Sequence, residues 1–364
     1  MLASDFSFDL PPELIAQTPA SPRDSARLLR LQRAGGAIQH LRFDAFAGIL
    51  RPDDLLVFND TRVLRARLRG WKMNVSGERG ARLEALLLRE VETNVWEALL
   101  RPSARLRVGT MLRFFSPDET VSIDAQPVER TDSHWIVRFE NSGDIRDVLE
   151  KIGEVPLPPY IAPPKEDAES DYQTVYARAD HELESAAAPT AGLHFTWGVL
   201  QELREREIQT TRVTLGIGIG TFRPIQSERI EDHAMHAENW EIGTDAAQII
   251  NAQKKRGARV VAVGTTATRV LESAADANGF VAAGNGRTGI YIRPGHRFRV
   301  VDALLTNFHL PRSSLLVMIA AFAQQGLGEG AQSMAGLNQI RYAYNVAIAE
   351  RYRFFSFGDA MFIE

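Results

Sequence analysis

Short apolar stretches separated by turn residues dominate the first 60 residues of the chain. Residues 28–31 are mainly apolar, Ala-Gly-Gly follows at 34–36, and apolar residues return at 38, 41 and 43. This arrangement predicts a β-hairpin over residues 27–43. A short helix is expected over residues 43–50, and the apolar run at 55–58 predicts a buried strand.

The pattern changes between residue 61 and about residue 138, where no helical period is visible. Apolar and polar residues alternate in short stretches at 63–68, 82–88, 95–100, 111–115 and 135–139. Such stretches predict a small β-barrel or sandwich. The proline-rich residues 155–164 are too stiff for a helix and too poor in N–H donors for a central strand, so they mark where this β module ends.

Strands and helices alternate in the remainder of the chain. Strands are expected at 211–219, 259–263, 298–305 and 354–362, and helices at 196–206, 244–255, 266–277, 313–323 and 337–351. Gly257 and Gly279 are expected to end helices, and Ser313 is a candidate N-cap. This alternation favours a parallel sheet covered on both faces. We therefore predict an α/β fold: a three-layer α/β/α main domain of residues 1–60 and 152–364, with an inserted small β-barrel domain at residues 61–151.

The composition is that of an ordinary globular chain, with 364 residues, 45% hydrophobic and 24% charged. There is no cysteine, which excludes disulfides, a cysteine nucleophile, thiolate zinc sites and iron–sulfur clusters. No secretory signal is visible, and the longest apolar run, residues 315–323, is far too short to cross a bilayer. A cytoplasmic monomer with no membrane contact is expected.

Charge is unevenly distributed, although the net charge is only −4. Residues 62–113 contain twelve basic and five acidic residues, whereas residues 140–184 contain four basic and twelve acidic residues. The basic segment is a candidate surface for nucleic-acid phosphates. The alternative is that the chain favours arginine throughout, with 37 Arg and 5 Lys, and that half-exposed strands place it outward. Charge alone leaves both interpretations open.

Two glycine-containing segments are candidate ligand loops. Residues 216–222 read Gly-Ile-Gly-Ile-Gly-Thr-Phe, but the third glycine of a dinucleotide motif would fall on Thr221, and Pro224 stands where a helix should begin. This segment is either a closely packed strand or a backbone that approaches a ligand. Gly264 is better placed, because it follows a strand and begins a helix whose free N–H groups can bind an anion or ribose oxygens.

Polar groups that can perform acid–base chemistry occur in three places. Asp232, His233, His236 and Glu238 lie within seven residues, a spacing open to a metal site, to acid–base catalysis or to an ordinary surface turn. His194 lies in a loop of small residues before a predicted helix, where it is either a core residue or a binding group. His309 follows a predicted strand, where open α/β sheets bind ligands. Spacing does not rank these histidines.

Ten segments, in order along nearly the whole chain, resemble one protein family. They are residues 8–17, 57–63, 152–161, 172–176, 187–196, 220–222, 231–238, 263–266, 301–311 and 352–363. Among them are Phe-Asp-Leu-Pro-Pro-Glu-Leu-Ile-Ala-Gln, Val-Phe-Asn-Asp-Thr-Arg-Val and Glu-Asp-His-Ala-Met-His-Ala-Glu. The chain resembles the S-adenosylmethionine:tRNA ribosyltransferase-isomerases of queuosine biosynthesis.

The resemblance implies an unusual use of S-adenosylmethionine as a co-substrate, with no prosthetic group and no metal. The ribosyl part of the molecule is transferred to the aminomethyl group of 7-aminomethyl-7-deazaguanine at the wobble position of tRNA. It then isomerises to the epoxycyclopentanediol of epoxyqueuosine, and adenine and methionine are released. The sulfonium already acidifies the neighbouring carbon, so the protein must supply one base, one acid and a pocket that excludes water.

The resemblance also assigns roles to candidate residues. The expected acid–base groups share one cleft: His194, His309, Asp232, His233, His236 and Glu238. The expected cofactor-binding residues are Asp60, Arg62, Pro189, Thr190, Ala191, Gly192, Phe195, Gly220, Thr221, Phe222, Gly264, Thr265, Thr266 and Asn307. The basic residues 62–113 become the expected contact with the tRNA backbone.

The chain departs from the family pattern in two places. Residues 215–218 read Leu-Gly-Ile-Gly where many relatives have Leu-His-Val-Gly, so Gly216 cannot be an acid or a base here. Residues 184–186 read Glu-Ser-Ala where relatives have Gly or Ala followed by Val. Two alternatives stay open: a non-catalytic tRNA-binding protein of the same fold, and a methyltransferase that uses the same cofactor.

Overall fold

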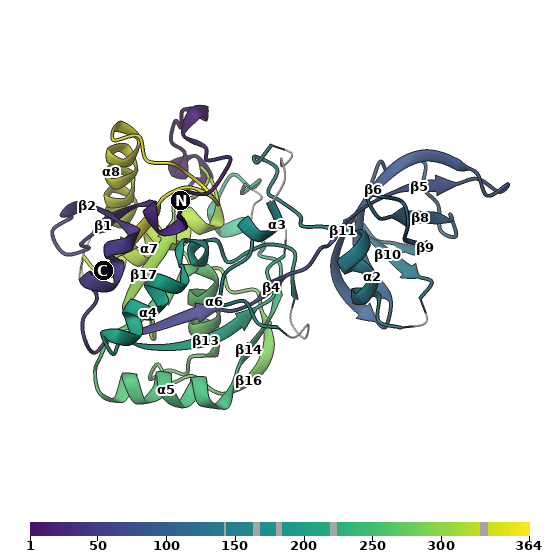
Figure 1. The fold of residues 1–364 in the computed structure, drawn as a ribbon. Coiled ribbons are helices and arrows are strands. Elements are labelled where there is room, and N and C mark those ends of the chain that lie inside the picture. The colour runs from purple at the N-terminus through teal and green to yellow at the C-terminus, as the bar shows by residue number, and fades with distance from the viewer. Residues whose placement is uncertain (142, 163–167, 180–183, 219–223, 328–333) are drawn as a thin grey trace. The chain divides into compact units, whose positions relative to one another are not determined.

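A computed structural model describes residues 1–141, 143–162, 168–179, 184–218, 224–327 and 334–364. The chain divides into two compact units (Figure 1). The larger unit contains Met1–Arg62, Pro158–Glu184 and Ala188–Glu364, and the smaller contains Val63–Leu157 and Ser185–Ala187. Val63–Leu157 begins two residues after the predicted insertion begins and ends six residues after it ends. The assignment of residues 61–151 to a separate inserted domain stays a prediction.

A nine-stranded sheet forms the centre of the larger unit. Its order is β16 (Gly284–Thr288), β14 (Glu238–Ile242), β13 (Gln209–Leu215), β3 (Leu55–Asn59), β15 (Val260–Val263), β17 (Ala303–Asn307), β18 (Ala360–Ile363), β1 (Arg27–Leu31) and β2 (Ile38–Arg42). The strands β13, β3, β15 and β17 are parallel neighbours. The predicted hairpin is confirmed, because β1 and β2 pair antiparallel.

The expectation of a parallel sheet is wrong in part, because the sheet is mixed. The strands β14, β16 and β18 each pair antiparallel with a neighbour. The sequence did not predict β16, which reads Gly-Asn-Gly-Arg-Thr and contains little that favours a strand. The strand expected over 298–305 begins only at Ala303, because the Glu272 carboxylate accepts the backbone N–H groups of residues 299–301.

Both faces of this sheet are buried, as a three-layer fold requires. Phe58 and Val261 contribute to a core on one face, together with residues of α1 (Phe46–Ile49) and α4 (Trp197–Glu205). Leu55 and Val57 alternate with them and are equally buried on the opposite face. The other described α-helices of the larger unit are α3 (Ala168–Asp171), α5 (Thr244–Lys255), α6 (Gly264–Ala274), α7 (Ser314–Gln325) and α8 (Ala335–Ala349). The predicted cap of α7 is confirmed, because Ser313 Oγ accepts from the N–H of Leu316 at 3.2 Å.

The smaller unit is a closed antiparallel β-barrel, one of the two predicted alternatives (Figure 1). Its strands follow the order β5 (Arg67–Met73), β6 (Arg79–Glu92), β7 (Val95–Arg101), β10 (Trp135–Phe139), β9 (Ser122–Arg130) and β8 (Leu112–Phe115), and β8 pairs back to β5. The short β11 (Gly153–Glu154) pairs with β5, and α2 (Ile145–Ile152) contributes Leu149 to the barrel core. The sequence missed β9, whose Pro127 interrupts the strand pattern and lies where the register with β10 shifts.

Short elements complete the chain. The strands β4 (Arg62–Val63) and β12 (Glu184–Ser185) have two residues each. Single 3₁₀ turns lie at Ala3–Phe6, Pro12–Leu14, Arg23–Ser25, Phe43–Ala45, Thr190–His194 and Ile230–Asp232. In the described parts of the chain, no helix combines the length and apolar character needed to span a bilayer.

Candidate functional site

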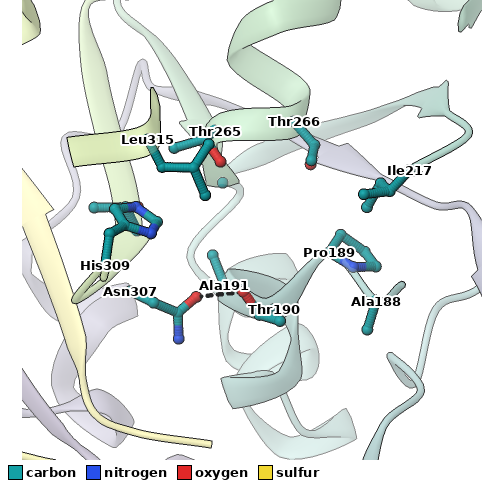
Figure 2. Close-up of a pocket in the computed structure, with 12 residues that line it drawn as sticks. Ala188, Pro189, Thr190, Ala191, Ile217, Thr265, Thr266, Asn307, His309 and Leu315 are labelled. Atoms are coloured by element: carbon teal, nitrogen blue, oxygen red, sulfur yellow. Dashed lines mark hydrogen bonds between the residues drawn. The ribbon is translucent and has the colours of Figure 1, made fainter. Parts of the chain in front are cut away.

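A pocket lies at the carboxyl ends of the parallel strands of the larger unit. Open α/β sheets bind ligands at this edge. Its walls come from the loop before α4, the segment after β13, the start of α6 and the end of β17 (Figure 2). The described residues that line it are Ala188, Pro189, Thr190, Ala191, Ile217, Gly264, Thr265, Thr266, Thr306, Asn307, His309 and Leu315.

The N-terminus of α6 forms one wall of this pocket. Gly264 has a φ of 91°, a conformation that favours glycine, and a Cβ there would lie 3.5 Å from the Cβ of Ala191. The first N–H groups of a helix have no partner within the helix, so they are available to a ligand. The hydroxyl of Thr266 is buried and has no hydrogen-bond partner in the part of the chain that the structure describes. The structure therefore has unused donors at this wall.

Thr190 and Asn307 connect two other walls. Thr190 Oγ1 donates to Asn307 Oδ1 at 2.8 Å, and Figure 2 shows this bond at the edge of the pocket. The amide Nδ2 of Asn307 donates to the carbonyl of Phe355 at 3.3 Å. Both hydrogen bonds fix the orientation of the Asn307 side chain, whose residue ends β17 and is 2% exposed. The Thr190–His194 turn is thereby tied to the central sheet.

His309 is the titratable side chain among the described lining residues of the pocket. Its Nε2 lies 2.8 Å from the hydroxyl of Thr306, and its backbone N–H donates to the hydroxyl of Tyr344 at 2.9 Å. Burial lowers the pKa of His309 to about 3. The imidazole is therefore neutral near pH 7, and in that form one of its ring nitrogens carries a lone pair.

His194 lies outside the lining of this pocket, in the core of the larger unit. Its two ring nitrogens lie 3.2 Å from the carbonyl oxygen of Ala191 and 3.0 Å from that of Gly358, and its ring stacks on Phe43. Burial lowers its pKa, although the two carbonyls oppose this shift. Phe195 is fully buried in the same core. These contacts match the core-residue alternative for His194.

Gly192 also lies outside the lining, and its lack of a side chain has a clear reason. A Cβ at this position would lie 1.9 Å from the hydroxyl oxygen of Tyr176. Tyr176 packs edge-on against Phe58, with ring centroids 4.7 Å apart. Gly192 therefore admits the Tyr176 ring beside the turn that carries Thr190 and Ala191.

The four polar residues at 232–238 differ in burial and in partners. Asp232 and His236 are exposed, and His233 is half-buried with its ring 5.4 Å from that of Tyr291. Burial, and then the charge of His236, lower the pKa of His233. Glu238 begins β14 and is 7% exposed, and it forms an ion pair with Arg269 of α6. The described lining residues of the pocket include none of these four side chains.

Asp60 follows β3 at the same carboxyl edge of the sheet. Its Oδ1 accepts a hydrogen bond from Thr214 Oγ1 at 2.7 Å, and Thr214 in turn accepts one from Arg178 at 3.0 Å. Burial raises the pKa of Asp60, while the Thr214 bond and the nearby arginines oppose the shift. Arg62 lies in β4 and is half-buried. Neither side chain belongs to the described pocket lining.

Eight residues expected from the sequence meet in one pocket. They are Pro189, Thr190, Ala191, Gly264, Thr265, Thr266, Asn307 and His309. Gly220, Thr221 and Phe222 lie outside the described residues. Within the ranges that the structure describes, no group of three or more acidic or histidine side chains could hold a metal ion.

Sequence reasoning missed four lining residues: Ala188, Ile217, Thr306 and Leu315. Thr306 could have been predicted from the sequence, because it lies at a strand end in the same polar segment as Asn307 and His309. It also missed Arg269, which is 1% exposed on α6. A lone arginine within the mostly small and apolar residues of a helix is the signal that marks it.

Comparisons with known proteins identify the family of the chain. A family model described as "Queuosine biosynthesis protein" matches residues 3–363. An S-adenosylmethionine:tRNA ribosyltransferase-isomerase of Acetivibrio thermocellus is 45% identical over 365 residues, and one of Moorella thermoacetica is 46% identical over 363, each covering 100% of both chains. A crystal structure of S-adenosylmethionine tRNA ribosyltransferase from Thermotoga maritima is 33% identical, has a TM-score of 0.54, and covers 99% of this chain and 100% of its own. The chain thus belongs to the queuosine biosynthesis family of S-adenosylmethionine:tRNA ribosyltransferase-isomerases.

Proposed function

We propose that this chain transfers the ribosyl part of S-adenosylmethionine to tRNA and isomerises it. The acceptor is the aminomethyl group of 7-aminomethyl-7-deazaguanine at the wobble position, and the products are epoxyqueuosine-tRNA, adenine and methionine. The observation that carries this proposal is full-length similarity, at about 45% identity, to proteins that bear the name of this activity. A non-catalytic tRNA-binding protein is not favoured, because His309 and unused hydrogen-bond donors line a pocket at the ligand-binding edge of the sheet.

The pocket at Thr190, Gly264 and His309 is the proposed site for S-adenosylmethionine. The N-terminal N–H groups of α6 and the hydroxyl of Thr266 are donors for its polar groups. The space open to water in this pocket is about 30 Å³, enough for one or two water molecules. Small-molecule sites typically measure about 300–1,000 Å³, so a bound nucleoside would extend beyond this space.

His309 is the proposed proton acceptor. A protonated imidazole would repel the positive sulfonium, but burial keeps His309 neutral near pH 7. The neutral ring can then accept the proton from the carbon next to the sulfonium, which the positive charge makes acidic. Thr306 holds one ring nitrogen in place, so the ring does not need to reorient during the transfer.

Asp60 is the proposed second acid–base group. Its raised pKa favours the protonated form more than in an ordinary aspartate, which suits a carboxyl that donates a proton. It follows β3, the neighbour of β15, whose end leads into Gly264. An acid here would protonate the adenine as it leaves.

The β-barrel supplies the proposed contact with the tRNA backbone. Many of its arginines are already paired with acidic side chains, namely Arg67 with Glu84, Arg69 with Glu154, Arg79 with Glu119, Arg89 with Glu97 and Arg113 with Asp124. Within residues 62–113, four exposed arginines have no acidic partner among the described residues: Arg82, Arg101, Arg105 and Arg107. Because no carboxylate in the described ranges neutralises these four side chains, they are available to phosphates. They are therefore the part of the basic segment that we propose as the tRNA contact.

One experiment tests the reaction directly. The full chain is incubated with S-adenosylmethionine and tRNA that carries the aminomethyl base, and the digested nucleosides are analysed by mass. We expect epoxyqueuosine, with free adenine and methionine in equal amounts. Production of S-adenosylhomocysteine would instead identify a methyltransferase. Binding of tRNA without any turnover would favour the non-catalytic alternative.

A further inference from the structure

Arg269 is a buried arginine that has no role in the proposed reaction. It lies on α6, is 1% exposed, and forms an ion pair with Glu238 through Nη1. The other oxygen of Glu238 accepts the backbone N–H of Gly218 at 2.8 Å. Gly218 directly follows Ile217, which lines the pocket. Glu238 thus holds the arginine head near the segment that forms a wall of the pocket.

One edge of the Arg269 guanidinium has no partner among the described residues. Its Nε and Nη2 atoms are buried and make no hydrogen bond. These two groups form the edge that binds a carboxylate side-on, with two parallel N–H donors. Burying donors without an acceptor costs free energy, so a buried arginine with one satisfied nitrogen and two unused ones indicates a site for an anion.

A second unused donor lies on the same helix. Thr266 lines the pocket, is 7% exposed, and its Oγ1 has no partner. It precedes Arg269 by three residues on α6, and residues at this spacing share a face of a helix. Side chains on a helix lean toward its N-terminus, which brings the arginine head toward Thr266. The positive end of the α6 dipole adds to the preference for an anion.

We propose that Arg269 and Thr266 bind the carboxylate of the methionine part of S-adenosylmethionine. This inference rests on the proposed function, because that function supplies the ligand. Arg269 forms a bidentate pair with the carboxylate through Nε and Nη2, and the Thr266 hydroxyl donates to the same group. Glu238 is then a positioning residue, which orients the guanidinium through Nη1. The carboxylate anchors the ligand while the sulfonium and the ribose face His309.

A change in the ligand tests this inference without a risk to folding. The affinity of the wild-type chain is measured by calorimetry for S-adenosylmethionine and for its decarboxylated analogue, which keeps the sulfonium and the nucleoside. We expect the analogue to bind about 10- to 100-fold more weakly, the range for a charged hydrogen-bonded pair. Free methionine and acetate serve as further probes, and they distinguish recognition of the whole ligand from recognition of any carboxylate.

The matching change in the protein is Arg269→Gln, made together with Glu238→Gln so that no buried charge is left unpaired. In this double variant the preference for the carboxylate should fall to about twofold or less, because the bidentate pair is lost. Arg269→Lys, which keeps the charge without the planar edge, should show an intermediate preference. The matched control is Arg259→Gln made together with Asp54→Asn, which removes the ion pair of a half-buried arginine just before β15, at the end of β15 away from the pocket. It should keep the full preference.

The possible results separate this inference from the function on which it rests. Equal affinity of the wild-type chain for the two ligands, with normal turnover, would overturn the carboxylate site and leave the function intact. A preference that survives unchanged in the double variant would also overturn it. Absence of both binding and adenine release would refute the function, and the inference with it. If the double variant does not fold, the comparison of ligands on the wild-type chain still decides.

Discussion

The hydroxyl of Thr306 lies 2.8 Å from Nε2 of His309, and both residues line the pocket at the carboxyl ends of the parallel strands. This pair joins a strand end to the titratable group of the pocket. Since β17 fixes Thr306, the hydrogen bond orients the imidazole through the central sheet. The position of His309 therefore depends on the fold itself, which suits a group that must be in place before the ligand arrives.

Replacement of His309 by glutamine should remove the proposed proton acceptor. We expect adenine release in a single turnover to slow by about 100-fold or more, the usual contribution of a positioned base. His40→Gln is the control, because His40 is an exposed residue of the edge strand β2 and should leave the rate within twofold. A rate for His309→Gln equal to that of the control would remove His309 from the mechanism.

His309 should also make the stability of the protein depend on pH. Its pKa is about 3 when folded and near 6.5 when unfolded, so between these values the unfolded chain binds more protons. The free energy of unfolding should therefore fall as pH decreases from 6.5 toward 3, by about 1 kcal/mol per pH unit from this group. Urea denaturation at pH 7 and pH 5 measures this slope. His309→Gln should show a shallower slope, and an unchanged slope would contradict the assignment.

Two substitutions test the close approach of Gly192, in the Thr190–His194 turn, to Tyr176. Gly192→Ala should destabilise the protein by about 1–3 kcal/mol, because the added methyl group meets the Tyr176 hydroxyl at 1.9 Å. Tyr176→Phe should be nearly neutral, since that hydroxyl is buried without a hydrogen-bond partner. In the double variant the loss should be smaller than in Gly192→Ala alone. Urea denaturation of all four proteins, wild type included, measures the coupling, and strictly additive effects would contradict the proposed contact.

The sequence predicted most of the elements that carry an apolar period, and it failed where pairing or capping came from distant residues. The helix at Thr244–Lys255 matches the predicted bounds, because its pattern is local. The strand β16 is stabilised by pairing with β14, which no local pattern reveals. Residues 299–301 look like a strand, but the distant carboxylate of Glu272 takes their N–H groups.

The same distinction applies to the site. Asn307 and Gly264 were found because they lie at strand ends, and topology brings such positions together in an open sheet. His194 looked equivalent to His309 in the sequence, yet two backbone carbonyls and the ring of Phe43 enclose it. Arg269 was not predicted as a site residue. What marks it is a pair of N–H groups without acceptors among the described residues, and only three-dimensional contacts reveal that. The sequence can therefore predict which residues lie at strand ends, but it cannot predict which buried donors lack an acceptor.

The Thr190–Asn307 hydrogen bond should support both stability and ligand binding. Thr190→Val keeps the shape of the side chain but leaves the buried Oδ1 of Asn307 without its donor. We expect a loss of about 1–3 kcal/mol in the free energy of unfolding and a higher KM for S-adenosylmethionine. Thr190→Ser retains the hydroxyl and should preserve both quantities. Thr190→Val with wild-type stability and KM would show that the bond has no such role.

The four unpaired arginines of the basic segment 62–113 should account for much of the affinity for tRNA. Substitution of Arg82, Arg101, Arg105 and Arg107 by glutamine removes four positive charges that have no acidic partner in the described chain. The slope of log affinity against log salt concentration should then become shallower by about 0.7–0.9 for each phosphate contact that is lost.

The control for that experiment changes the net charge by the same amount. Glutamine replaces Arg69, Arg79, Arg89 and Arg113, each of which forms an ion pair with a carboxylate. If tRNA responds only to the overall charge of the barrel, both quadruple variants will lose the same affinity and show the same salt slope. If phosphates contact the free guanidinium groups, the first variant will lose several units of slope while the control keeps a slope close to that of the wild type. Because surface ion pairs contribute little to stability, both variants should remain folded, so the comparison isolates where the tRNA backbone binds.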